Sequence, residues 1–112
     1  MSTSEPDTFS ALTELVAALD ARFPDHNGPF ERVSRLCEEA GELAGAVNHF
    51  EGMGIKNDKH GPPDTEHLVK EIGDVLRAAV GIAHNYGVLD QLQDSIHHHH
   101  RRYRDMGYMP GS

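Results

Sequence analysis

The segment FERVSRLCEEAGELAGAVNHF, residues 30–50, combines the apolar spacing of a helix with a compact acidic motif. Its apolar residues recur three or four positions apart, so they fall on one side of an α-helix. The pattern ends at Gly52-Met53-Gly54, where glycine opposes a further helical turn. The segment therefore predicts a long amphipathic helix that turns one side toward a core. Its apolar residues are Phe30, Val33, Leu36, Ala40, Leu43, Val47 and Phe50.

Three other segments have the same spacing. The first ends near Phe23, the second begins after Asp64 or Thr65 as its expected N-cap, and the third begins near Leu89. No strand-like alternation and no internal repeat occurs in the sequence. We therefore predict an all-α fold, a four-helix bundle with antiparallel neighbours. The residues expected to face the core are Phe9, Leu12, Val16, Leu19 and Phe23, then Leu68, Ile72, Val75, Ala79 and Ile82, and finally Leu92, Ile96 and Tyr103.

Length and charge limit the classes of protein to which the chain can belong. Its 112 residues suit one domain, which is small enough that dimerisation would help to bury apolar surface. We expect a flexible leader over residues 1–7, a single domain over 8–106 and a flexible tail over 107–112. The formal net charge of −8 argues against nucleic acid or membrane partners, because those anionic surfaces repel an acidic protein.

The cellular location is predicted from three further features of the sequence. The single cysteine, Cys37, excludes an intramolecular disulfide. No apolar run is long enough to span a bilayer, and the first residues lack the charged and apolar pattern of a signal peptide. We therefore expect a cytoplasmic protein.

Two acidic motifs lie on separate predicted helices, Glu38-Glu39-Ala40-Gly41-Glu42 on one and Glu71-Ile72-Gly73-Asp74 on the next. At about 100° per residue, Glu39 and Glu42 fall about 60° and 120° from the centre of the apolar side of their helix. Glu71 and Asp74 share one flank of the other helix, about 60° apart. Two such flanks can meet across a groove, which would bring four carboxylates together. Glu38 lies on the same side but further round.

Four carboxylates at close range repel one another, and a divalent cation removes that conflict. Oxygen ligands without Cys or His in the motif favour Mg²⁺, with Mn²⁺ as a substitute. We therefore expect Glu39, Glu42, Glu71 and Asp74 to hold the metal and a nucleotide polyphosphate to bring negative charge to it. Glu38 is the candidate to accept the proton of an attacking water. Either motif alone is more often part of a solvent-exposed helix surface. The prediction of a metal site therefore rests on the two motifs occurring together.

The paired motifs, followed by Val75-Leu76, resemble the signature of the MazG-like all-α nucleoside triphosphate pyrophosphohydrolases. The resemblance runs from about Phe30 to Tyr103. It implies a helical bundle assembled as a dimer or tetramer, Mg²⁺-dependent cleavage between the α- and β-phosphates, and release of a nucleoside monophosphate and pyrophosphate. By position, it assigns the metal to the same four acidic residues and makes Glu38 a further ligand or base.

The chain departs from this family in its last predicted helix, where the run His97–His100 stands in place of the usual Lys and Asn. The related phosphoribosyl-ATP pyrophosphohydrolases are less similar, because Arg77 and Ala78 replace their Tyr-His pair. Other cationic, polar and aromatic residues are candidates to bind substrate. These are Lys56, Lys59, Asn85, Arg102 and Tyr103.

We therefore predict an enzyme, a nucleoside triphosphate pyrophosphohydrolase acting on an acid anhydride. The alternative is a non-catalytic helical regulatory or assembly module whose acids bind a structural cation, and it predicts metal-dependent stability without turnover. A di-iron carboxylate bundle requires Glu-x-x-His pairs, which neither acidic helix supplies. The sequence leaves open the preferred base and sugar, the choice between canonical and damaged nucleotides, and the number of metal ions.

Overall fold

The computed structural model describes residues 4–52 and 64–111 and shows four α-helices in these ranges. They are α1, Thr8–Arg22; α2, Pro29–Phe50; α4, Thr65–Asn85; and α5, Leu89–Asp105. No strand occurs in the described residues. The predicted all-α fold is therefore confirmed. Among these helices, none is long and apolar enough to cross a membrane.

Short polar residues and glycine set the ends of two helices. The Asp7 carboxylate accepts a hydrogen bond of 2.9 Å from the backbone N–H of Ser10 at the start of α1. Asp64 accepts one of 3.0 Å from the N–H of Glu66, so the N-cap expected for α4 is confirmed. After α4, Gly87 has a φ of +67°, a left-handed conformation that glycine adopts without strain. These local signals explain why the helix boundaries follow the sequence pattern closely.

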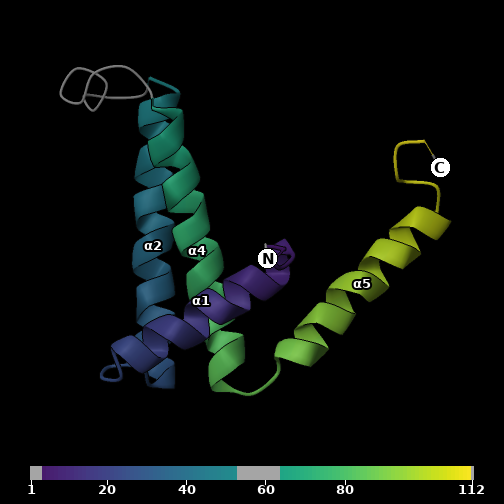
Figure 1. Cartoon of the computed structure of the whole chain (residues 1–112). Coiled ribbons are helices and arrows are strands. Elements are labelled where there is room, and N and C mark those ends of the chain that lie inside the picture. Colours follow the sequence, from purple (N-terminus) through teal and green to yellow (C-terminus); the bar gives the residue numbers. More distant parts are fainter. Residues whose placement is uncertain (1–3, 53–63, 112) are drawn as a thin grey trace.

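The helices α2 and α4 lie side by side and antiparallel, and α1 crosses this pair and packs on α4 (Figure 1). The buried apolar side chains are few and small, and each of the three helices contributes at least one of them. They are Val16, Ala46, Val80 and Ala83. The core of the described chain is therefore slight for its length, and much apolar surface stays exposed.

A buried arginine joins the three packed helices. Arg32 of α2 donates to the Asp20 carboxylate of α1 at 2.6 Å and to the Gly81 carbonyl of α4 at 3.1 Å. Its Nε donates to the Asn27 carbonyl at 2.7 Å. These bonds compensate for the burial of the guanidinium, because its Nε, Nη1 and Nη2 groups each donate to an oxygen acceptor. Arg32 therefore links α1 and α4 to α2.

The helix α5 extends away from the other three (Figure 1). It contacts α4 and has no buried residue. Leu92 is half-buried, whereas Ile96 and Tyr103 are 50% and 43% exposed. The prediction that Ile96 and Tyr103 face a core is therefore wrong for the single chain, because α5 leaves the bundle. Tyr103 instead stacks on Tyr108 with 5.7 Å between ring centroids.

Part of the expected apolar core of α2 and α4 is also exposed. Phe30 and Ile72 were expected to be buried, but they are 87% and 42% exposed. At about 100° per residue, the exposed apolar residues of both helices turn away from the side that carries Glu42 and Asp74. They form one apolar surface on the opposite side of the pair, which we call the α2–α4 apolar face. Its members are Val33, Val47, Val69, Ile72 and Leu76.

Candidate metal centre

Three glutamates converge between α2 and α4. Glu39 and Glu42 of α2 and Glu71 of α4 each offer one carboxylate oxygen, and these oxygens all lie within 4.8 Å of one another. Glu39 and Glu42 share a flank because they are three residues apart, and the antiparallel neighbour turns Glu71 toward them. The structure thus brings together three of the four residues that the sequence analysis assigned to a metal.

Two oxygens of this cluster are buried without a partner in the described part of the chain. They are Oε2 of Glu39 and Oε2 of Glu71. The Glu71 side chain is only 6% exposed, and its Oε1 lies 3.9 Å from the His67 Nε2 and 3.7 Å from the Lys70 Nζ. A buried carboxylate oxygen without a donor or cation is costly. The donor set, three carboxylates with two free oxygens, fits a hard divalent cation such as Mg²⁺.

The electrostatics of Glu39 agree with this description. Burial raises the pKa of the Glu39 carboxyl, and the negative charges of Glu42, Asp74 and Glu71 raise it further. Both causes act against the ionised form. A bound cation would reverse the effect of the neighbouring charges, so a cation and the cluster would stabilise each other.

Asp74, the fourth predicted ligand, is held differently. It lies on α4 one turn after Glu71, close enough for its charge to act on Glu39, but its carboxylate is not among the three that converge. Lys70 Nζ donates to Asp74 Oδ2 at 2.8 Å, and Arg77 Nη2 lies 3.3 Å from Oδ1. The hydrogen bond with Asp74 raises the pKa of the Lys70 ammonium. Both oxygens of Asp74 therefore already have cationic partners from the same helix.

Glu38 does not join the cluster. It is exposed and lines a separate surface pocket together with His26, Glu31, Ser34 and Arg35. The reason is helical geometry, because adjacent residues differ by about 100° in direction. Its assignment as a proton acceptor stays a prediction.

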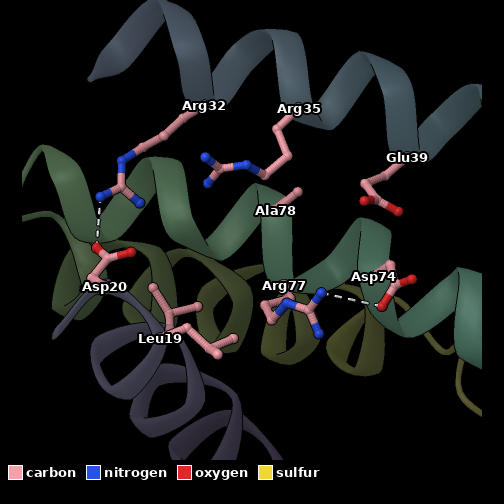
Figure 2. Close-up of a pocket in the computed structure, with 9 residues that line it drawn as sticks. Leu19, Asp20, Arg32, Arg35, Glu39, Asp74, Arg77 and Ala78 are labelled. Carbon is pink, nitrogen blue, oxygen red and sulfur yellow. Dashed lines mark hydrogen bonds and ion pairs between the residues drawn. The ribbon is translucent and has the colours of Figure 1, made fainter. Parts of the chain in front are cut away.

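A small cavity of about 60 Å³ lies beside the acids, between α1, α2 and α4. Figure 2 shows the Arg35 and Arg77 guanidinium groups on its two sides, Glu39 and Asp74 at one end, and the Asp20–Arg32 ion pair at the other. Neither Arg35 nor Arg77 is among the site residues predicted from the sequence. Their spacing was the available signal, because Arg35 precedes Glu39 by one turn and Arg77 follows Asp74 by one turn.

The residues predicted to bind substrate are not brought to this cavity in the described chain. Lys56 and Lys59 lie outside the described residues. Asn85 is exposed in the last turn of α4, and Arg102 and Tyr103 are exposed on α5. None of these three lines the cavity beside the acids. Arg102 instead lines a surface pocket with His98, Arg101, Asp105 and Met106.

Comparison with known proteins gives this geometry a family context. A sequence model of the MazG nucleotide pyrophosphohydrolase domain matches residues 29–100, more than half of the chain. The uncharacterized protein YvdC of Bacillus subtilis (strain 168) is 38% identical over 78 residues, which cover 67% of this chain and 72% of YvdC. The uncharacterized protein YpjD of the same organism is 37% identical over 71 residues, which cover 62% of this chain and 61% of YpjD. No solved structure gave a significant match.

Proposed function

Because the chain belongs to the family of MazG nucleotide pyrophosphohydrolase domains, we propose that it hydrolyses a nucleoside or deoxynucleoside triphosphate between the α- and β-phosphates. The products would be the nucleoside monophosphate and pyrophosphate. Mg²⁺ would be held by Glu39, Glu42, Glu71 and Asp74, with Mn²⁺ as a substitute. The observation that carries the proposal is the pair of buried, unpartnered oxygens on Glu39 and Glu71, which lie beside the Glu42 carboxylate.

The chain's own residues have separate tasks in this reaction. Mg²⁺, when bound, would neutralise phosphate charge and make water a better nucleophile. Glu39 and Glu71 are the more buried glutamates and would fix the cation between α2 and α4, whereas the exposed Glu42 lies on the side open to substrate. Water attacks one phosphorus of the α–β bridge, and the bond from that phosphorus to the bridging oxygen breaks. A carboxylate accepts the proton of the water, and Glu38 is the predicted acceptor.

We include self-association in the proposal. The α2–α4 apolar face lies on the opposite side of the helix pair from the acids, so a second copy can cover it without blocking the metal centre. Burial of such a surface would compensate for the small core of one chain. A homodimer, or a homotetramer made from two dimers, satisfies this requirement. A cytoplasmic location, where nucleotide substrates are available, completes the proposal.

The proposal is tested by measuring pyrophosphate release from canonical and damaged NTPs and dNTPs in Mg²⁺, Mn²⁺ or EDTA. We expect release that requires the metal and falls at least about a hundredfold in Glu42→Gln, which removes a ligand charge but preserves side-chain size. Glu14→Gln is the matched control, because Glu14 is exposed on α1 and the change in charge is identical. Circular dichroism of each variant verifies its folding.

Two other results would contradict the enzyme proposal. If no nucleotide is cleaved while Mg²⁺ still raises the melting temperature, the chain is the non-catalytic metal-binding module. If cleavage persists in EDTA or in Glu42→Gln at the wild-type rate, the acidic cluster is not the active site.

A further inference from the structure

The acidic residues beside the cavity differ in how much of their charge is already neutralised. The cations Lys70 and Arg77 occupy both oxygens of Asp74, at 2.8 Å and 3.3 Å. The Oε2 atoms of Glu39 and Glu71 have no such partner among the described residues. The Asp74 side chain is only 12% exposed, whereas the Lys70 and Arg77 side chains are 64% and 41% exposed. A divalent cation that binds Asp74 would therefore compete with Lys70 and Arg77 for the carboxylate.

The two basic groups lie in different surroundings. The Lys70 side chain is 64% exposed and is absent from the lining of the cavity beside the acids. Arg77 lines that cavity, opposite Arg35, and its guanidinium points along the cavity toward Asp74 (Figure 2). If Arg77 leaves Asp74, it stays next to the space where phosphate oxygens would approach the metal. Lys70 can instead turn into solvent.

We propose that Arg77 is a phosphate-binding residue whose guanidinium is paired with Asp74 before ligand arrives and transfers to the substrate polyphosphate when metal binds Asp74. This inference rests on the proposed function. It deepens that function by assigning a cation that complements the metal on the phosphate chain. A planar guanidinium suits the task, because its N–H groups can pair with two phosphate oxygens at once. The exchange leaves both side chains paired with an opposite charge, because Asp74 gains the metal and Arg77 gains the phosphate.

A purely structural role for Arg77 makes a different prediction. An i, i+3 ion pair within one helix contributes only a few tenths of a kcal/mol to an isolated helix. If Arg77 only held Asp74 in position for the metal, its removal would weaken the binding of metal and of phosphate together. If it competes with metal for Asp74 and then binds phosphate, its removal affects the two ligands in opposite directions.

The test uses isothermal titration calorimetry on the full chain, first with Mg²⁺ alone and then with inorganic pyrophosphate at saturating Mg²⁺. We expect Arg77→Gln to bind Mg²⁺ alone about two- to fivefold more tightly, because it frees Asp74 Oδ1 and removes a positive charge. We expect the same variant to bind pyrophosphate at least about tenfold more weakly, because a charged hydrogen-bond partner is lost. Arg77→Lys should recover part of the pyrophosphate affinity.

Two variants make the result specific. Lys70→Gln frees the other oxygen of Asp74, so it should also bind Mg²⁺ more tightly but lose less than about threefold in pyrophosphate affinity. Arg22→Gln, on the exposed last turn of α1, makes the same change in charge away from the cavity and should match the wild type. Circular dichroism verifies the fold of each variant.

Each contrary result has a separate meaning. Parallel loss of Mg²⁺ and pyrophosphate affinity in Arg77→Gln overturns the inference in favour of a positioning role. Unchanged pyrophosphate affinity in Arg77→Gln also overturns the inference. In that case, Mg²⁺ binding by the wild type would still support the proposed function. If the wild type binds neither Mg²⁺ nor pyrophosphate, the inference and the proposed function both fail.

Discussion

The α2–α4 pair and α5 have amphipathic sequences of the same general kind, yet they differ in how they pack in the chain. The pair packs along its length and buries Glu71 and Ala46, whereas α5 buries no residue and extends away. An apolar groove lies at the base of α5, lined by residues such as Ile82, Tyr86 and Leu92. Amphipathicity therefore predicts that a helix has an apolar side but not which chain covers that side. The pair is organised by contacts within the chain, and we expect α5 to require another copy.

The largest expected effect is on the packed region. Arg32→Ala removes the group that joins α1, α2 and α4 and leaves the Asp20 carboxylate without its 2.6 Å hydrogen bond. Loss of one member of a buried ion pair typically costs about 3 kcal/mol. Urea unfolding should show this decrease in the free energy of unfolding. Arg22→Ala, which removes an exposed arginine from α1, should change it by less than about 0.5 kcal/mol, and equal losses in both variants would disprove the joining role.

The second effect is the response of the α2–α4 pair to metal. At about 100 times its dissociation constant, Mg²⁺ should raise the free energy of unfolding by about 2.7 kcal/mol, because only the folded chain presents the converged carboxylates. Glu71→Gln should lose this response yet gain stability in EDTA, because a buried, partly unpaired charge is removed. Thermal and urea unfolding with Mg²⁺ or EDTA measure both changes. A full Mg²⁺ response in the variant would exclude Glu71 as a ligand.

The third effect separates association from folding. Leu76→Asp introduces a charge into the α2–α4 apolar face, where the side chain is 52% exposed in the single chain. We expect self-association to weaken at least about tenfold while the helical content is unchanged. Sedimentation equilibrium measures the association constant. Leu15→Asp is a control with the same exposed fraction on α1, and a loss of association confined to this control would place the interface elsewhere.

The smallest expected effect is a pH dependence of the metal-free chain. The pKa of Glu39 is raised above its ordinary value of 4.5 in the folded state, chiefly by burial. The folded chain therefore binds this proton more strongly than the unfolded chain. The resulting stabilisation is complete below pH 4.5 and is lost as pH rises through the raised pKa. In EDTA, wild type should lose more stability than Glu39→Gln between about pH 4.5 and 7 in urea unfolding. Identical pH profiles would show that Glu39 does not titrate abnormally.

The sequence predicted where the helices lie better than it predicted which of their residues are buried. Periodicity, the cap at Asp64 and the helix end near Phe23 located the helices, because these signals act over a few residues. Periodicity could not show that Ile72 and Ile96 remain exposed, since burial depends on which helices meet. The same distinction applies to the site. Three-residue spacing predicted that Glu39 and Glu42 share a flank. The same kind of spacing places Lys70 and Arg77 within reach of Asp74, but it does not show that together they occupy both oxygens of the carboxylate.

The four acidic residues all lie inside α2 and α4, with more than one helical turn on either side of each motif. Groups carried by helix interiors are positioned more rigidly than groups carried by loops. The cavity wall, in contrast, is shared with α1 through residues such as Leu19. In the proposed function, the paired helices would carry the reaction chemistry and α1 would contribute to ligand selection. Changes on α1 can reshape the cavity while the paired helices keep the acids in register, so libraries that alter selectivity should begin on α1.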